Sequence, residues 1–221
     1  MHAPARQALE RLLAAYAPLR PAPLCPEILV HRAHTLVAVW EAAEQLAGVP
    51  VPSPFWAWPW AGGCALARVL LDAPELVRGS NVLDFGAGGG VTALAAARAG
   101  SACITANDTD PWSLLVTRIA ADAQQLAVEL LADDMCEVPA LVDDYDVVLC
   151  SDLAYERSQA PRQRAVLERA LRNRATVLVA DAGRTYFDPG GMQLLAEYQV
   201  DVPVDLEGIA VRTARCYRLV P

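Results

Sequence analysis

The topology of this chain follows from one short run: Asn81-Val82-Leu83-Asp84-Phe85-Gly86-Ala87-Gly88-Gly89-Gly90-Val91. Its first five residues are mostly apolar and predict a strand, and the alanine-rich residues 91–99 predict a helix that ends at Gly100. The glycines between them predict a tight loop. Because glycine has no side chain, such a loop lets backbone amides approach a ligand closely. The run therefore predicts a ligand-binding turn at the carboxyl end of a strand.

Two classes of cofactor could use this loop. The dinucleotide fingerprint G-x-G-x-x-G/A fails when it starts at Gly86, where the sixth position is Val91, but passes from Gly88, where the sixth is Ala93. The second class is a cofactor that carries a cationic amine. Asp84 favours this class over a dinucleotide, because a carboxylate two residues before the first glycine repels a pyrophosphate and suits a cationic amine. A nicotinamide dehydrogenase stays open as an alternative.

Strands and helices alternate after the loop. We expect strands at 81–85, 103–107, 128–131, 146–151 and 176–181, and helices at 91–99, 112–126 and 162–173. Continuously apolar strands separated by helices predict a parallel sheet that is covered on both faces. Two consecutive strands, expected at 198–204 and 211–219, predict an antiparallel hairpin at the sheet edge. The predicted fold class is α/β and Rossmann-like, with a mostly parallel seven-stranded sheet and an antiparallel C-terminal hairpin.

Acidic residues follow several of these strands. Asp108 comes directly after the strand 103–107, and Asp133-Asp134 follow the strand that ends at Leu131. The fourth strand closes with Ser151-Asp152-Leu153-Ala154-Tyr155. Ligands bind at the carboxyl ends of the strands in an open parallel sheet, so Asp152 and Tyr155 are expected to face a ligand together. The alternative is that Asp152 only caps the next helix.

The N-terminal part is less regular. We expect a helical and extended appendage over 1–50, with helices at 6–17 and 34–46, a proline-rich linker between them and a short strand at 28–30. A second domain is expected over 51–221. Its first residues, 50–63, hold three of the five tryptophans, and their prolines exclude a regular helix until a helix starts at 64. This aromatic loop either plugs the core or lines a ligand cavity.

The composition of the chain favours some partners, locations and kinds of site over others. The chain has 221 residues, 54% of them hydrophobic, and eighteen basic against twenty-six acidic residues give a net charge of −8. A nucleic-acid partner is disfavoured and a basic protein partner is favoured. No apolar run is long enough to span a membrane, and the start, Met1–Arg6, has no apolar signal core. Single, scattered cysteines predict reduced thiols, a cytoplasmic location and, with His2, His31 and His34 as the histidines, no metal site. All basic residues are arginine, so no lysine of this chain can act as a nucleophile.

The pattern Asp84-x-Gly86-x-Gly88-x-Gly90 resembles the first motif of class I S-adenosylmethionine-dependent methyltransferases. This resemblance implies that S-adenosylmethionine is the cofactor and that Gly86, Gly88 and Gly90 cradle its amino-acid end near Asp84. It also implies that Asp108 binds the ribose hydroxyls and that an acid after the third strand, for which we favour Asp134, lies beside the adenine.

Within that class, the chain resembles the electron-transfer flavoprotein beta-subunit lysine methyltransferase family from about residue 50 to the C-terminus. The resemblance rests on Pro54-Phe55-Trp56-Ala57, Trp60-Ala61-Gly62-Gly63, Ala65-Leu66-Ala67-Arg68, Val77-Arg78-Gly79, Ala106-Asn107-Asp108, Asp152-Leu153-Ala154-Tyr155 and Ala180-Asp181-Ala182-Gly183-Arg184. The chain departs from the family pattern at Ser151, where glycine is usual, and at Ala182, where proline is usual.

The resemblance implies a protein-lysine N-methyltransferase that acts on the flavoprotein beta subunit or a similar protein. Asp152 would orient the amine and Tyr155 would shape its channel, while Trp60 and Ser151 would contact the cofactor. Trp56 and Trp58 are further candidates for holding a cationic amine. Two alternatives remain: a small-molecule N-methyltransferase for a nicotinamide-like compound or an amine, and a non-catalytic module that only binds the cofactor.

Overall fold

The computed structural model describes residues 4–221, so the first half of the expected start segment, including His2, lies outside the described residues. The main sheet consists of β3 (Asn81–Phe85), β4 (Cys103–Asn107), β5 (Glu129–Leu131), β6 (Val147–Ser151), β7 (Thr176–Asp181), β8 (Met192–Asp201) and β9 (Val211–Leu219). Its strand order is β5-β4-β3-β6-β7-β9-β8. The strands β3 to β7 are parallel, and β9 runs antiparallel to both β7 and β8. This confirms the predicted seven-stranded sheet and its antiparallel hairpin.

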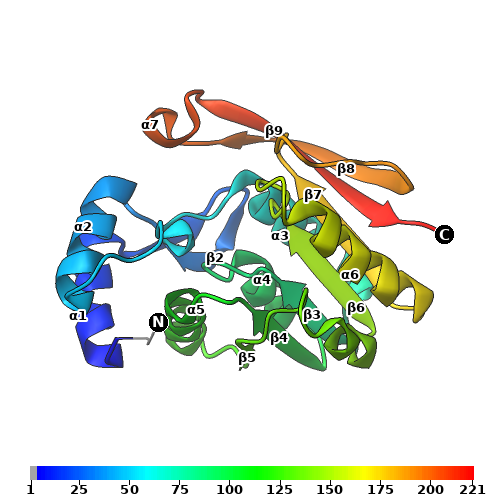
Figure 1. The fold of residues 1–221 in the computed structure, drawn as a ribbon, viewed down its shortest axis with the longest axis horizontal. Coiled ribbons are helices and arrows are strands. Elements are labelled where there is room, and N and C mark those ends of the chain that lie inside the picture. The colour runs from blue at the N-terminus through cyan, green and yellow to red at the C-terminus, as the bar shows by residue number, and fades with distance from the viewer. Residues whose placement is uncertain (1–3) are drawn as a thin grey trace.

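Helices cover both faces of the sheet. They are α3 (Ala61–Asp72), α4 (Val91–Ala99), α5 (Pro111–Ala123) and α6 (Ala160–Arg172). On one face α3 packs against α4 and against β7 and β9, and on the other face α6 packs against β7. Each face has its own cluster of buried apolar side chains, because the strands are apolar on both sides. Figure 1 shows the β8–β9 hairpin along one edge of the sheet.

The N-terminal elements are α1 (Arg6–Tyr16), β1 (Leu19–Ala22), β2 (Cys25–His31), α2 (Leu36–Ala47) and a 3₁₀ turn at Phe55–Ala57. Figure 1 shows α1 and α2 at the end of the molecule opposite the C-terminus. The expected linker at 18–26 was wrong in part, because β1 and β2 pair as a two-stranded antiparallel sheet. Proline is tolerated there since a two-stranded ribbon consists of edge strands, where a missing N–H leaves no gap in a ladder. The domain boundary at residue 50 stays a prediction.

The start of α3 also differs from the expectation. The helix begins at Ala61, so Gly62 and Gly63 lie inside it and the aromatic loop ends at Trp60. A Cβ on Gly62 would lie 2.7 Å from Asp152 Oδ2, and one on Gly63 would lie 2.9 Å from Val91 Cγ1. The two glycines lower the intrinsic helix propensity, but they let the first turn of α3 pack against its neighbours.

The hairpin is longer than expected. The strand β8 begins at Met192 rather than at 198, and a four-residue helix, α7 (Val204–Glu207), lies in the connection to β9. Among residues 4–221, no helix combines the length and the apolar character that a membrane span needs.

Candidate active site

A cavity of about 690 Å³ lies along the carboxyl ends of β3, β4 and β6. The strand order reverses between β3 and β6, which is where open parallel sheets bind their ligands. The cavity brings together most of the predicted site residues, namely Trp60, Gly86, Gly88, Asp108, Asp134, Ser151, Asp152 and Tyr155. Asp84 and Gly90 do not line it.

The glycine loop needs its glycines for two different reasons. Gly86, Gly88 and Gly90 all have positive φ angles, of 75°, 54° and 82°, which L side chains rarely adopt. A Cβ on Gly86 would lie 2.5 Å from Leu153, and one on Gly90 would lie 2.6 Å from Thr117. At Gly88 a Cβ would meet no atom within 4 Å, so this glycine faces open space. Gly86 and Gly90 therefore hold the loop in place, and Gly88 presents it to the cavity.

Asp84 lies beneath the loop rather than in the cavity. It is 1% exposed, and its Oδ2 accepts a hydrogen bond of 2.9 Å from the backbone N–H of Ala93 in the first turn of α4. Burial, with a smaller contribution from the nearby Asp108, raises the pKa of Asp84 to about 7. Its carboxylate thus joins β3 to α4 directly.

Asp108 connects the loop to β4. Its Oδ2 accepts from the N–H of Gly88 at 2.8 Å, and its Oδ1 accepts from the N–H of Asp110 at 2.9 Å. Burial raises the pKa of Asp108. Asp110 also lines the cavity and caps α5 by accepting from Trp112 N–H at 2.9 Å. Asp110 is not among the predicted site residues, although an aspartate directly before Pro111 is a typical helix start.

The two candidate acids after β5 are distinguished by their positions. Asp134 lines the cavity and accepts a 2.8 Å hydrogen bond from Cys136 N–H, whereas Asp133 is exposed and does not line it. Asn107 fixes this loop because its Nδ2 donates to the backbone oxygens of Leu131 and Asp133. The preference for Asp134 therefore agrees with its place at the cavity.

Asp152 is the most constrained carboxylate of the site. Its side chain is 5% exposed, and its φ of 49° is left-handed, a conformation that surrounding contacts must hold. Its Oδ2 accepts from Gly62 N–H at 2.6 Å, and its Oδ1 accepts from Ala182 N–H at 3.0 Å and from Arg184 Nε at 3.2 Å. Burial raises the pKa of Asp152, and the Arg184 guanidinium opposes that rise.

Arg184 links Asp152 to the C-terminal hairpin. Its Nη2 lies 3.3 Å from Glu207 Oε1. The Glu207 side chain is only 3% exposed and also pairs with Arg212 at 2.9 Å. The guanidinium carbon lies 5.0 Å from the centre of the Trp60 ring, within the range of cation–π contact. Arg184 therefore braces Asp152 from the side of the hairpin.

The aromatic loop serves the core and the cavity at once. Trp56 is 2% exposed and stacks on Trp112 at a ring separation of 6.1 Å, and Arg32 lies over Trp58 at 4.8 Å. Neither of these tryptophans lines the main cavity, so their predicted contact with a substrate amine is not supported.

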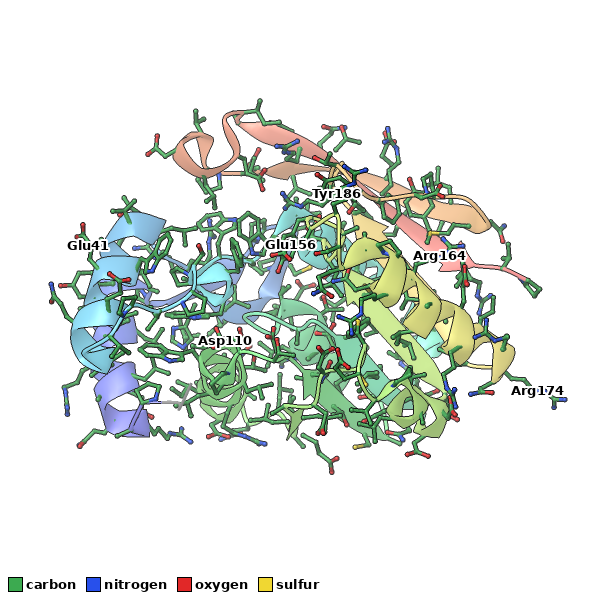
Figure 2. All side chains as sticks on the ribbon, viewed as in Figure 1. Glu41, Asp110, Glu156, Arg164, Arg174 and Tyr186 are labelled. Atoms are coloured by element: carbon green, nitrogen blue, oxygen red, sulfur yellow. The ribbon has the colours of Figure 1, made fainter. Side chains whose placement is uncertain are left out.

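The cavity is instead bordered by Trp60, Phe55 and Tyr155. Phe55 lies between the other two rings, with centroids 5.8 Å from Trp60 and 5.6 Å from Tyr155. Phe55 was missed as a site residue because nothing in a proline-rich aromatic loop tells which ring faces the cavity. Asp110 and Glu156, both labelled in Figure 2, line the cavity from the start of α5 and from the turn after β6.

The polar groups on the cavity wall fit S-adenosylmethionine better than a dinucleotide. The backbone N–H of Gly88, which a pyrophosphate would need, is already bound to the Asp108 carboxylate. Asp108, Asp110 and Asp134 place several carboxylates on the cavity wall, which suits hydroxyl and amino donors and a cationic ligand. Residues 4–221 contain no group of three or more histidine, cysteine, aspartate or glutamate side chains arranged to hold a metal ion.

Comparisons with solved structures agree with this fold. A putative S-adenosylmethionine-dependent methyltransferase from Streptococcus mutans aligns with a TM-score of 0.54 at 14% identity, over 72% of this chain and 49% of that one. SMU.776, a putative methyltransferase complexed with SAH, aligns with a TM-score of 0.54 at 12% identity, over 86% of this chain and 53% of that one. At these identities the likeness shows the fold alone.

The sequence comparisons are more specific. Residues 82–180 match a family model described as a methyltransferase domain. The electron transfer flavoprotein beta subunit lysine methyltransferase of Danio rerio is 33% identical over 175 residues, which are 76% of this chain and 67% of that protein. The proteins of the same name from Rattus norvegicus and Homo sapiens are 33% and 35% identical, over 82% and 70% of this chain and 72% and 58% of their own lengths. This chain is therefore an S-adenosylmethionine-dependent methyltransferase and belongs to the electron transfer flavoprotein beta subunit lysine methyltransferase family.

Proposed function

We propose that this protein transfers a methyl group from S-adenosylmethionine to a lysine side chain of electron transfer flavoprotein beta subunit or a similar protein. The observation that carries the proposal is the buried, braced carboxylate of Asp152 at the same cavity as the glycine loop. The names of the relatives support the choice of substrate. A cytoplasmic location, and the absence of nucleic-acid and membrane partners, stay predictions from composition.

For the cofactor, we propose one part of the cavity for each part of the molecule. Gly86 and Gly88 would receive its amino-acid end, with Gly90 and Asp84 holding the loop from below. Asp108 would bind the ribose hydroxyls, because its carboxylate lies at the loop and has acceptor capacity beyond its two backbone partners.

The remaining cofactor contacts come from two sides of the cavity. Asp134 would lie beside the adenine, and Trp60 and Ser151 would border the methyl-bearing end. When bound, S-adenosylmethionine supplies an electrophilic methyl group whose transfer to an amine leaves a neutral thioether.

Asp152 has the capacity to orient a lysine amine. A carboxylate offers about four lone-pair positions, and three hydrogen bonds are already made, so one acceptor position on Oδ2 remains. An amine that donates to this oxygen would be fixed in direction, and alignment of the reacting atoms is the main demand of an in-line displacement. A lysine ammonium has no lone pair, so its proton leaves to solvent before transfer, and Asp152 need not be a strong base.

The exposed residues at the entrance of the cavity favour an amine that is carried by a protein over a free small amine. Tyr155 is 46% exposed and Phe55 is 44% exposed, and together they form an aromatic border around the entrance. An enclosed small-molecule site would bury these rings. The net charge of −8 also favours approach of a segment that presents basic residues.

The test is methyl transfer to purified electron transfer flavoprotein, read by intact mass and by methyl-lysine in the hydrolysate. Because this chain contains no lysine, every methyl-lysine detected comes from the substrate. We expect mass gains with the wild type, little or no gain with Asp152→Asn, and wild-type gains with Asp133→Asn, whose carboxylate is exposed beside the cavity.

Failure of the wild type to transfer, with cofactor binding shown separately, would retire this substrate and favour the small-amine alternative. Full turnover by Asp152→Asn would contradict the role of Asp152 and leave the substrate assignment untouched.

A further inference from the structure

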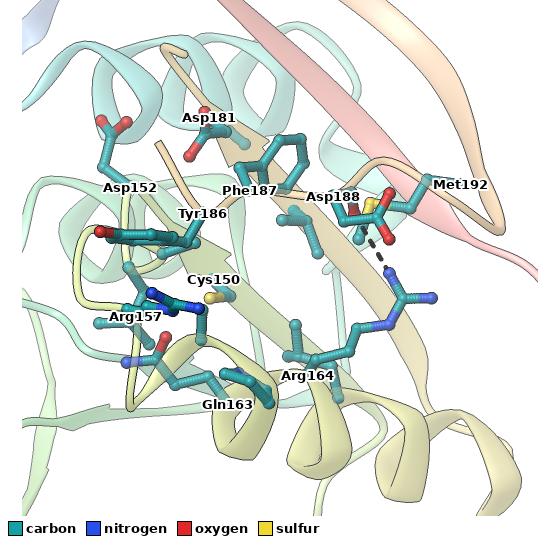
Figure 3. Close-up of a pocket in the computed structure, with 17 residues that line it drawn as sticks. Cys150, Asp152, Arg157, Gln163, Arg164, Asp181, Tyr186, Phe187, Asp188 and Met192 are labelled. Carbon is teal, nitrogen blue, oxygen red and sulfur yellow. Dashed lines mark hydrogen bonds between the residues drawn. The ribbon is translucent and has the colours of Figure 1, made fainter. Parts of the chain in front are cut away.

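A second cavity of about 460 Å³ lies beside the first. It is bordered by the ends of β6 and β7, the first turns of α6 and the segment before β8, as Figure 3 shows. The two cavities share Asp152, Leu153 and Gln163, so only the turn after β6 separates them. Apart from Asp152, none of the residues assigned a part in the methyl transfer points to a use for this second space, although its volume lies in the range of roughly 300–1,000 Å³ that is common for ligand sites.

Its walls are mostly apolar. Leu153, Leu167, Val179, Phe187 and Met192 supply much of the lining. Such walls accept an alkyl chain and reject a small, fully hydrated ion.

The walls also carry Arg157, Arg164 and Tyr186, but two buried acceptor atoms among the lining residues have no donor. Asp181 is 4% exposed; its Oδ1 accepts from the N–H groups of Gly183 and Arg184 at 2.7 and 2.8 Å, while its buried Oδ2 has no hydrogen-bond partner among the described residues. Gln163 Oε1, on α6, is also buried without a partner among residues 4–221. A buried acceptor without a donor costs about 1–3 kcal/mol, and more when it is charged. Two such atoms on one cavity point to a ligand that brings N–H donors.

A cationic donor fits better than a neutral one. Burial, together with the charge of Asp152, raises the pKa of Asp181 to about 6, so the carboxylate is still mainly ionised at neutral pH. Arg184 cannot neutralise it fully, because its side chain pairs with Asp152 and Glu207. Arg164 is bound to Glu168 and to the backbone oxygen of Gly190.

We propose that the second cavity binds a basic side chain of the substrate protein, an alkylammonium or alkylguanidinium group, next to the lysine that is methylated. Lysine and arginine combine an apolar stem with a charged head, which matches apolar walls and a buried carboxylate. This inference rests on the proposed function, since it names a second residue that the substrate segment must present.

The direct test is to titrate the full chain with n-butylammonium and with n-butylguanidinium at neutral pH and to measure binding by NMR. These probes distinguish the two possible head groups and need no methyl transfer. We expect shifts around α6 and the end of β7, with an affinity about tenfold or more weaker in Asp181→Asn, a change of about 1.4 kcal/mol or more. Asp201→Asn, a matched change at an exposed site on β8, leaves the affinity unchanged.

Arg157 is the rival occupant from this chain, since it lines the same cavity. If Arg157 filled the cavity, wild-type protein would bind neither probe and Arg157→Gln would bind them, and that result would overturn the inference. Binding by the wild type that is retained in Arg157→Gln supports it.

Kinetics on the flavoprotein substrate complete the test. Asp181→Asn raises KM for the protein about tenfold or more while kcat and cofactor affinity change little, because the lost contact is to the substrate. Ala160→Phe, which adds a large side chain to the cavity from the start of α6 and keeps the Asp181 carboxylate, has the same effect and serves if Asp181→Asn does not fold.

An unchanged KM in both variants, with normal methyl transfer, overturns the second site and leaves the proposed function intact. Probe binding without any methyl transfer to the flavoprotein keeps the cavity and contradicts the proposed substrate instead.

Discussion

At the level of single residues, the site is a concentration of buried carboxylates. Burial raises the pKa values of the aspartates at the carboxyl edge of the sheet, namely Asp84, Asp108, Asp110, Asp152 and Asp181. Each of them, apart from any ligand, is held by backbone N–H donors. Such an edge is poorly suited to phosphate and well suited to a cofactor and a substrate that are both cationic.

Asp134 and Asp133 allow a matched test of the cofactor site. Asp134 lines the cavity and its neighbour does not, so Asp134→Asn removes a negative charge from the cavity wall and Asp133→Asn removes one from the surface. We expect Asp134→Asn to weaken S-adenosylmethionine binding about tenfold, or about 1.4 kcal/mol, by isothermal titration calorimetry. Equal affinities of the two variants for S-adenosylmethionine would contradict the assignment of Asp134 to the adenine and would indicate that the adenine binds elsewhere in the cavity.

Asp84 predicts a pH dependence of stability. Its pKa is about 7 in the folded chain and about 4 in an unfolded chain, so the folded state binds more protons between these values. Stability from this group is therefore fully present below pH 4 and is lost as the pH rises through 7. Relative to the wild type, Asp84→Asn should gain unfolding free energy over that interval, by up to about 4 kcal/mol.

Urea denaturation of both proteins at pH 4.5, 6 and 7.5 measures this difference. The buried aspartates that do not interact with Asp84 titrate alike in both chains and cancel in the comparison, whereas Asp108 makes only the smaller contribution. A difference that stays constant with pH would contradict the raised pKa of Asp84.

At the level of elements, the sequence predicts best those segments whose residue pattern is compatible with a single type of secondary structure. The strands at 81–85, 103–107, 176–181 and 211–219 have the predicted bounds, because a short apolar run between breakers has few other conformations. The start of α3 could not be predicted, since Gly62 and Gly63 are there for the approach of Asp152 and Val91, residues far away in the sequence. The partner of Arg184 was equally hidden, because Glu207 comes from a helix of four residues in the hairpin connection.

That connection predicts a long-range effect on catalysis. Glu207 fixes the position of the Arg184 guanidinium beside Asp152, and Arg184 opposes the rise in the pKa of Asp152. Glu207→Gln removes this support, so the guanidinium is held less closely against Asp152 and that pKa rises. Since ionised Asp152 is the proposed active form, activity then falls at a higher pH than in the wild type. We expect the acidic limb of the kcat profile to move to higher pH, with cofactor affinity unchanged.

Glu197→Gln is the matched control. Glu197 pairs with Arg215 on the same hairpin, but both side chains are nearly half exposed, and such pairs contribute about 1 kcal/mol or less. Its pH profile should overlay that of the wild type. A profile of Glu207→Gln that falls in height without moving in pH would indicate general loss of structure rather than loss of the brace.

For the whole molecule, the N-terminal elements and the cofactor loop form one packed unit. Leu9, Leu13, Val39 and Trp56 share a buried cluster with Trp112 of α5. The Trp56 backbone oxygen lies so close to the loop that a Cβ on Gly89 would come within 2.5 Å of it. We therefore expect the packing of α1 and α2 to support the glycine loop through the 3₁₀ turn that carries Trp56.

Trp56→Ala tests this coupling. Removing a buried tryptophan costs about 3–5 kcal/mol of unfolding free energy, whereas Trp40→Ala removes a side chain that is 37% exposed and one hydrogen bond to Val51 O, at a cost of about 1 kcal/mol. Circular dichroism during urea denaturation measures both. Because the Trp56 backbone borders Gly89, we also expect weaker S-adenosylmethionine binding in Trp56→Ala at a temperature where that variant is still folded. Loss of stability with wild-type cofactor affinity would show that the N-terminal cluster supports the fold and leaves the loop unaffected.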